Sequence, residues 1–304
     1  MNAALIGVDW GTSQLRAYLL AGDGAILDRR EAARGILTVA AGGFPVVLSD
    51  ALEGWPGGLP VILSGMVGSR QGWVEAPYLP CPARPSDLAG ALVTLDVPGL
   101  GPARLVPGLS FRHGDGQPDV MRGEETQIAG ALVAMGLSDG LFVLGGTHSK
   151  WVRVEAGAIA GFSTYMTGEV FSALRGHTIL GRLMPEGERG DGPGLRRGVL
   201  EGAALPSAGG LLARLFSVRA LGLFDELPGR ELSDYLSGLL IGAEMAAATR
   251  DGAGRFIAVK SAGLERQYDD AADILGLDCV PAPADCVVLG HLAIARAAGL
   301  VADA

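Results

Sequence analysis

The chain has 304 residues, a formal net charge of −9 and 49% hydrophobic residues, but only 6% aromatic residues. This length exceeds what one core comfortably holds, so we expect two domains packed mainly by aliphatic side chains. The acidic balance argues against a nucleic-acid surface, because no basic stripe is available to neutralise a phosphate backbone. The three cysteines, Cys81, Cys279 and Cys286, show no C-x-x-C spacing, which argues against a zinc knuckle or a disulfide framework. With no leader-like N-terminus and no run of about 18 apolar residues, we expect a cytoplasmic protein without a membrane partner.

The N-terminal stretch predicts a hairpin with a carboxylate beside its turn. An apolar run ends at Asp9, the turn contains Gly11, Thr12 and Ser13, and a second apolar run follows at 15–20. Such a turn can direct backbone N–H groups and two hydroxyls at phosphate oxygens, while Asp9 can hold a hydrated Mg²⁺. An ordinary hairpin turn is the alternative. Residues 25–31 can add a third antiparallel strand and complete a meander.

The next elements predict a buried strand that leads into a ligand loop. The apolar stripe at 43–54 favours a helix, and the apolar run at 60–63 favours a parallel strand. Its carboxyl end leads into 64–73, where open α/β sheets place their ligand loops. The forty residues that follow are rich in proline and glycine, and we interpret them as a covering segment. A helix is then expected from Glu124, with two acids in its first turn.

The opening pattern recurs after this helix. Residues 141–144 lead into Gly146 and Thr147, and two further strands are expected up to residue 165. Gly11 aligns with Gly146 at an offset of 135 residues, which indicates a duplicated domain and not a solenoid. The remainder is mostly helical, with predicted helices at 168–180, 198–204, 209–221, 231–249, 262–275 and 284–298 and a short strand at 256–259.

Six motifs in this order resemble the 2-dehydro-3-deoxygalactonokinase family of the sugar-kinase, hexokinase and actin superfamily. They are D-W-G-T-S-x-L-R from Asp9, G-M-V-G-S-x-x-G-W from Gly65, M-R-G-E-E-T-Q from Met121, G-T-H-S-K-W from Gly146, M-T-G-E from Met166 and the segment 236–244. The resemblance implies an α/β fold of two duplicated RNase H-like, actin-like ATPase domains, 1–123 and 124–304, with a nucleotide cleft between them and the last helix packing back toward it. It also implies ATP-dependent phosphorylation of the 6-hydroxyl of 2-dehydro-3-deoxy-D-galactonate during galactonate degradation.

The resemblance assigns roles to particular residues. Asp9 would be the Mg²⁺-associated acid, and Glu124 or Glu125 the catalytic base. The expected nucleotide-binding residues are Gly11, Thr12, Ser13, Gly146, Thr147, His148, Gly242, Ser261 and Gly263. The expected substrate-binding residues are Gly65, Met66, Val67, Gly68, Ser69, Arg70, Trp73, Arg122, Lys150 and Glu169. His148 could instead orient its turn, Trp73 could be a core residue, and Glu244 could be a surface residue or a ribose contact.

Two departures from the family pattern bear on this interpretation. Gly145 and Ser149 stand where the family usually has proline and cysteine, and Ser261 stands where a glycine is expected beside the adenine, directly after Lys260. Two other functions therefore stay open: a superfamily kinase for another sugar or keto-deoxy sugar acid, and a catalytically inactive nucleotide-binding regulator. A homodimer is compatible with the sequence.

Overall fold

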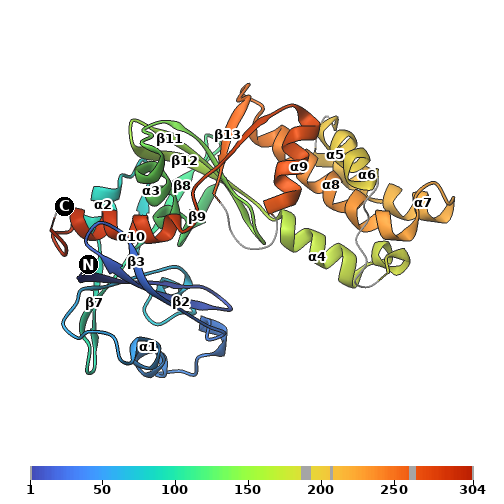
Figure 1. Cartoon of the computed structure of the whole chain (residues 1–304). Coiled ribbons are helices and arrows are strands. Elements are labelled where there is room, and N and C mark those ends of the chain that lie inside the picture. Colours follow the sequence, from blue (N-terminus) through green and yellow to red (C-terminus); the bar gives the residue numbers. More distant parts are fainter. Residues whose placement is uncertain (1, 186–192, 206–207, 260–264, 303–304) are drawn as a thin grey trace. The chain divides into compact units, whose positions relative to one another are not determined.

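The computed structural model describes residues 2–185, 193–205, 208–259 and 265–302. The chain divides into two compact units (Figure 1). The first contains Met1–Gly140, Val152–Phe162 and Ala282–Ala304, and the second contains Leu141–Trp151 and Ser163–Pro281. The sequence predicted a boundary before Glu124; the first compact unit includes the helix that begins there and extends to Gly140. Over the described residues, no helix combines the length and the apolar character that crossing a membrane requires.

The first unit is built on a six-stranded sheet of order β3-β2-β1-β4-β7-β6. Strands β1 (Ala3–Trp10), β2 (Leu15–Ala21) and β3 (Ile26–Ala32) form an antiparallel meander, and β4 (Val61–Ser64) lies parallel to β1. The predicted hairpin, third strand and buried parallel strand are therefore confirmed. Side chains alternate across β1, so Ile6, Val8 and Trp10 face one side of the sheet and Gly7 and Asp9 face the other.

The proline- and glycine-rich segment is not only a cover, and that interpretation was wrong. Strand β7 (Gly101–Leu105) pairs parallel with β4, and β6 (Val93–Val97) pairs antiparallel with β7, so both complete the main sheet. The segment also contains α2 (Pro85–Gly90) and a three-stranded sheet of β5 (Tyr78–Pro80), β8 (Gly108–Arg112) and β9 (Pro118–Met121). These elements are three to six residues long, and short elements carry little periodicity to predict them from.

Helices cover both faces of the main sheet. Helix α1 (Phe44–Leu52) packs on the face of Trp10, and Leu48 of α1 is fully buried there. On the other face, α10 (Cys286–Ala297) contacts β1 and β4 and crosses α3 (Glu124–Met135) at Gly130 and Gly290. The C-terminal helix therefore packs beside the start of α3 (Figure 1). Two short 3₁₀ helices, Ile36–Thr38 and Met66–Gly68, complete this unit.

The second sheet repeats the order of the first. Its strands are β10 (Gly140–Leu144), β11 (Ser149–Glu155), β12 (Ala158–Tyr165), β13 (Arg255–Ala258) and β14 (Asp278–Pro281). The order β12-β11-β10-β13-β14 matches β3-β2-β1-β4-β7, with β10, β13 and β14 parallel. The predicted duplication is confirmed, although β14 was missed.

Helices make up most of the second unit. They are α4 (Thr167–His177), the 3₁₀ helix Ile179–Leu183, α5 (Gly194–Ala203), α6 (Ala208–Leu215), α7 (Ser217–Leu223), α8 (Gly229–Ala248) and α9 (Glu265–Leu275). The helix predicted at 209–221 is thus two helices. A Cβ on Gly242 would lie 2.3 Å from the Val199 carbonyl oxygen, so α5 and α8 cross in close contact at glycines. Gly238, four residues earlier on α8, makes a similar contact, because a Cβ there would lie 2.5 Å from the Leu195 carbonyl oxygen.

Candidate active site

Asp9 lies at the carboxyl end of β1 within a row of polar residues that crosses the sheet. In the strand register, Glu31, Arg16, Asp9 and Ser64 are successive partners on β3, β2, β1 and β4. The Asp9 side chain is 19% exposed, and Arg16 Nη1 lies 3.7 Å from its Oδ2. Burial raises the pKa of Asp9 to about 6, Arg16 lowers it and the nearby Glu124 raises it. A second carboxylate thus lies close enough to Asp9 to disfavour its charge, and a cation would relieve that repulsion.

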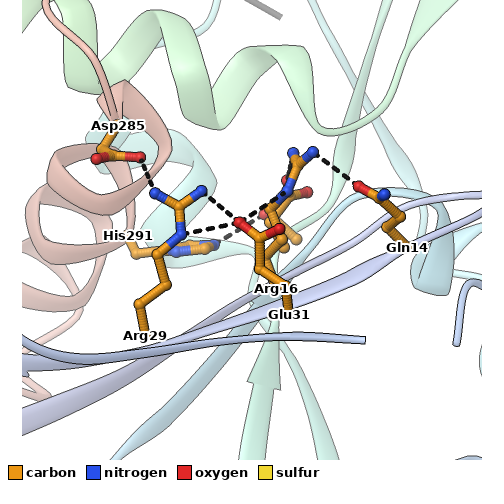
Figure 2. Close-up of polar contacts among 8 residues, drawn as sticks. Gln14, Arg16, Arg29, Glu31, Asp285 and His291 are labelled. Carbon is orange, nitrogen blue, oxygen red and sulfur yellow. Dashed lines mark hydrogen bonds and ion pairs between the residues drawn. The ribbon is translucent and has the colours of Figure 1, made fainter. Parts of the chain in front are cut away.

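The row continues as a chain of charges to the start of α10 (Figure 2). Arg29 lies between Glu31, at 2.5 Å, and Asp285, at 3.3 Å. Arg16 also donates to Gln14 Oε1 over 2.9 Å. Arg16 thus lies between the carboxylates of Asp9, at 3.7 Å, and Glu31, at 3.9 Å.

The backbone of the turn after Asp9 is fixed by hydrogen bonds from Gly35 and Ile36, while its side chains are exposed. Gly35 N donates to Ser13 O over 3.1 Å, and Ile36 N donates to Gly11 O over 3.1 Å. A Cβ on Gly35 would lie 2.3 Å from the Thr12 carbonyl oxygen, so only glycine permits this contact. Thr12 and Ser13 are themselves exposed. Their side chains are accessible to a ligand while their backbone is fixed.

Three chain segments meet beside Asp9. Gly65, which follows β4 with φ +92°, would place a Cβ 2.9 Å from the Trp10 carbonyl oxygen and 3.2 Å from Asp9 Oδ1. Gly123, with φ +106°, would place a Cβ 3.1 Å from the Gly65 Cα. Both positive φ values favour glycine. The ends of β1 and β4 and the start of α3 therefore converge, which joins the predicted carboxylate, the predicted sugar loop and the predicted base within one unit.

The two glutamates at the start of α3 have different surroundings. Glu124 is half-buried, and its Oε2 accepts from Arg122 N over 2.9 Å. Glu125 is fully buried and accepts from Gly123 N over 2.7 Å and from the Thr126 hydroxyl over 2.9 Å. Burial, helped by Glu124, raises the pKa of Glu125 to about 8 although these donors oppose the shift. Glu125 is enclosed by its own helix start, whereas Glu124 retains an exposed surface.

The predicted sugar loop, Gly65–Trp73, divides into buried and exposed parts. Val67, Gly68 and Ser69 are buried, and Met66 is half-buried. The Trp73 ring is half-buried and stacks on Phe44 with centroids 6.1 Å apart, so it contributes to the core. The Arg70 side chain is 81% exposed and lies 3.3 Å from Glu75.

Arg122 is a buried cation beside this loop. It is 7% exposed, its guanidinium lies 4.3 Å from the centre of the Tyr78 ring, and Nη2 donates to Ala76 O over 2.7 Å. Nε and Nη1 are buried and have no hydrogen-bond partner in the described part of the chain. A Cβ on Gly68 would lie 3.0 Å from Nη1. The loop is thus packed against a positive charge that is not fully hydrogen-bonded.

The second glycine-threonine turn follows β10 in the other unit. Thr147 and His148 are exposed, like their counterparts Thr12 and Ser13. The Thr147 carbonyl accepts from Glu169 N over 3.0 Å, and His148 Nε2 lies 2.5 Å from Glu169 Oε2. Lys150 is buried and donates to the Thr164 hydroxyl over 2.7 Å. Glu169 and His148 were predicted for separate roles and are partners.

Other predicted residues lie elsewhere. Gly242 is in the helix crossing described above, and Ser261 and Gly263, with Lys260, lie outside the described residues. Glu244 is 3% exposed and hydrogen-bonded to Trp151 and Tyr268, so it is not a surface residue.

The ranges that the structure describes contain no group of three or more acidic, histidine or cysteine side chains that could hold a metal ion. Mg²⁺ commonly needs only one or two carboxylates, with water and phosphate oxygens supplying the rest.

Known protein sequences match this chain over most of its length. The model of the DGOK family, 2-keto-3-deoxy-galactonokinase, matches residues 9–294. The 2-dehydro-3-deoxygalactonokinase of Escherichia coli (strain K12) is 36% identical over 291 residues, which cover 94% of each chain.

The chain belongs to the 2-keto-3-deoxy-galactonokinase family. It is a kinase of galactonate degradation, as the motifs predicted, and membership of a kinase family implies a nucleotide as the phosphoryl donor. A crystal structure of a putative 2-dehydro-3-deoxygalactonokinase from Sinorhizobium meliloti is 38% identical, with a TM-score of 0.88 over 96% of this chain and 98% of that one. An activator of 2-hydroxyisocaproyl-CoA dehydratase from Clostridium difficile, at 13% identity, shares the fold with a TM-score of 0.50 over 96% of this chain and 92% of that one. The family's actin-like ATPase fold, predicted from the sequence, is confirmed.

Proposed function

We propose that this cytoplasmic kinase transfers the γ-phosphoryl group of ATP to the 6-hydroxyl of 2-dehydro-3-deoxy-D-galactonate, with Glu124 as the base. Family membership supports the reaction class. The observation that carries the residue assignment is the convergence of Asp9, Gly65 and Gly123 at the start of α3. Phosphoryl transfer needs mainly positioned groups and neutralised charge, which this convergence can supply.

Glu124 is the better of the two candidate bases. It retains an exposed surface, whereas Glu125 is fully buried and already accepts two hydrogen bonds. A general base must reach the hydroxyl proton directly or through one water molecule. Glu124 would accept the proton of the attacking hydroxyl, and Glu125 would hold the helix start in place.

Asp9 is the proposed Mg²⁺ residue. Its carboxylate is partly buried and lies near a second carboxylate, so its surroundings favour a divalent cation with one protein ligand and several waters. When bound, Mg²⁺ would neutralise phosphate charge and orient phosphate oxygens. Arg16 directs a positive charge to the same carboxylate and would keep it ionised.

Two turns are proposed to bind nucleotide phosphates. In the first unit, Gly11, Thr12 and Ser13 combine a fixed backbone with exposed hydroxyls. In the second, the Thr147 carbonyl accepts from Glu169 N, the Thr147 hydroxyl is exposed beside Gly146, and His148 adds an exposed imidazole whose partner is Glu169. Backbone N–H groups in such turns favour anions. Ser261 and Gly263 remain the residues proposed for the adenosine.

The substrate carboxylate is proposed to lie near the Gly65–Ser69 loop. Arg122 supplies a buried positive charge behind this loop, with two N–H groups that no described residue accepts. Such an incompletely paired cation favours an anionic sugar over a neutral one. Arg70, Trp73 and Lys150 are proposed as weaker contributors, because the first is largely exposed and the others are engaged in packing or hydrogen bonding.

Paired variants of the two glutamates test the assignment. We expect Glu124→Gln to reduce ADP release with 2-dehydro-3-deoxy-D-galactonate at least ~100-fold while ATP affinity, measured by calorimetry, stays within about twofold. Glu125→Gln should retain most of the turnover. If Glu124→Gln stays active and Glu125→Gln does not, the base is Glu125. An assay with the C4 epimer and with neutral hexoses tests the proposed sugar, and ATP binding without turnover of any sugar would indicate a regulator.

A further inference from the structure

Glu244 forms the centre of a buried hydrogen-bond cluster in the second unit. Its Oε1 accepts from Trp151 Nε1 over 2.7 Å and from the Tyr268 hydroxyl over 2.8 Å, and its Oε2 accepts from the Thr167 hydroxyl. The side chain is 3% exposed. These partners come from β11, α9 and α4, so one carboxylate on α8 ties three other elements together. Burial raises the pKa of Glu244, and the hydrogen bonds from its donors oppose that shift.

The cluster contacts the residues on either side of the turn at Gly146–His148. Ser149 directly follows His148, and its Oγ lies 2.6 Å from the Tyr268 hydroxyl. The Tyr268 ring also packs against the start of the turn, because a Cβ on Gly145 would lie 3.1 Å from ring atom Cε2. One side of the turn is therefore supported by the same tyrosine that donates to Glu244.

The other side of the turn rests on the start of α4. Thr167 donates to Glu244, and the next residue, Gly168, would place a Cβ 2.5 Å from the Gly146 carbonyl oxygen and 2.9 Å from the Thr147 Cα. Glu169 N then donates to the Thr147 carbonyl over 3.0 Å. The turn thus packs between Tyr268 and the start of α4. Tyr268 and Thr167, which begins α4, both donate hydrogen bonds to the Glu244 carboxylate.

We infer that Glu244 is a positioning residue for the nucleotide phosphates: it fixes Tyr268 and Thr167 and, through them, the Gly146–His148 turn. The inference rests on the proposed phosphate-binding role of that turn. Anion binding by backbone N–H groups needs donors that are already in place, because misplacement by about 1 Å can cost two orders of magnitude in rate. Glu244 itself touches no reacting atom in this role.

A carboxylate is needed for this role because every partner is a donor. In Glu244→Gln one acceptor oxygen becomes an NH₂ group that would face Trp151 N–H or a hydroxyl hydrogen. Tyr268→Phe removes one donor and keeps the ring against Gly145. Thr167→Val removes another donor, and Thr167→Ser restores it.

The experiment measures KM for ATP, KM for the sugar acid, kcat and the melting temperature for each variant. We expect Glu244→Gln, Tyr268→Phe and Thr167→Val each to raise KM for ATP about tenfold, with KM for the sugar acid changed less than about twofold. Thr167→Ser should restore KM for ATP. Tyr235→Phe is the matched control. Tyr235 is buried like Tyr268 and lies on α8 like Glu244. Its hydroxyl donates to Glu201 over 2.6 Å and lies 2.7 Å from Ser217, neither of which belongs to the turn.

The outcomes separate this inference from the proposed function. If the folded Glu244 and Tyr268 variants keep KM for ATP within about twofold of the parent, or if Tyr235→Phe raises it equally, Glu244 is only structural and the inference is overturned. Thr147→Val tests the turn itself. If Thr147→Val leaves ATP binding unchanged, the proposed contact of the Thr147 hydroxyl with phosphate fails; if it weakens ATP binding while the cluster variants do not, only the positioning role fails.

Discussion

Gly290 of α10 and Thr126 of α3 lie so close that a Cβ on Gly290 would be 1.8 Å from the Thr126 carbonyl oxygen. The contact is reciprocal, because a Cβ on Gly130 of α3 would be 1.7 Å from the Cys286 carbonyl oxygen. The two helix backbones therefore touch at two glycines. Because Glu124 and Glu125 begin α3, this crossing also places the proposed base.

We expect Gly290→Ala to lower the free energy of unfolding by about 2 kcal/mol or more, because the added methyl group must push one helix away from the other. Urea denaturation followed by circular dichroism measures the change. Gly90→Ala in α2 is the control: a Cβ there has open space, so its effect should stay within about 0.5 kcal/mol. Equal stability of the two variants would show that the helices separate at no cost.

The buried His291 should make the free energy of unfolding depend on pH. Its Nε2 lies 2.8 Å from Ser64 Oγ, its Nδ1 has no partner among the described residues, and burial lowers its pKa to about 3. The unfolded chain takes up a proton near pH 6.5, whereas the folded chain does not. The folded state therefore loses stability as the pH falls below 6.5, by about 1 kcal/mol per pH unit.

His291→Gln should remove this part of the slope. The two chains are compared by urea denaturation at several values between pH 5 and pH 7.5, so that the other titrating groups cancel. The stability of the parent relative to the variant should decrease as the pH falls. A constant difference across this range would contradict a neutral, buried His291.

The sequence predicted the two meanders because each shows apolar runs separated by Gly-Thr turns, and because the pattern occurs twice. β1 to β3 and β10 to β12 follow that pattern. The strands β6, β7 and β14 carry no such local signal. Their four or five residues become strands only by pairing with a neighbour already in the sheet, which local sequence does not show.

The candidate site was predicted in part for a related reason. Motifs identified Asp9, Gly65 and Glu124 as residues of interest, but their proximity depends on the positive φ of Gly65 and Gly123. Glu124 and Glu125 are neighbours on a helix and therefore point in different directions. The motif alone does not show which of the two side chains is buried. Glu244 has partners 24 to 93 residues away, so its role could not be derived from neighbouring residues.

Asp9→Asn tests the proposed magnesium residue. The amide keeps the size of the side chain and removes its charge, so we expect kcat to fall at least ~100-fold and the Mg²⁺ concentration for half-maximal rate to rise. Removing Mg²⁺ with EDTA should abolish turnover in the parent. Asp23→Asn, in the exposed turn after β2, is the matched control and should change neither value. An unchanged Mg²⁺ requirement in Asp9→Asn would place the metal on another residue.

Arg122→Met tests whether the buried cation selects an acidic sugar. Methionine keeps much of the apolar stem beside Tyr78 and removes the charge, so KM for the sugar acid should rise about tenfold or more. KM for ATP should change less than about twofold, because the contacts of the Arg122 guanidinium are with Tyr78 and Ala76 and not with the proposed nucleotide turns. Arg112→Met is the control, since Arg112 is exposed on β8 and donates only to the Gly116 carbonyl among the hydrogen bonds recorded for it. If Arg122→Met raises KM for a neutral hexose as much as for the sugar acid, Arg122 supports the loop by packing and its charge does not select the substrate.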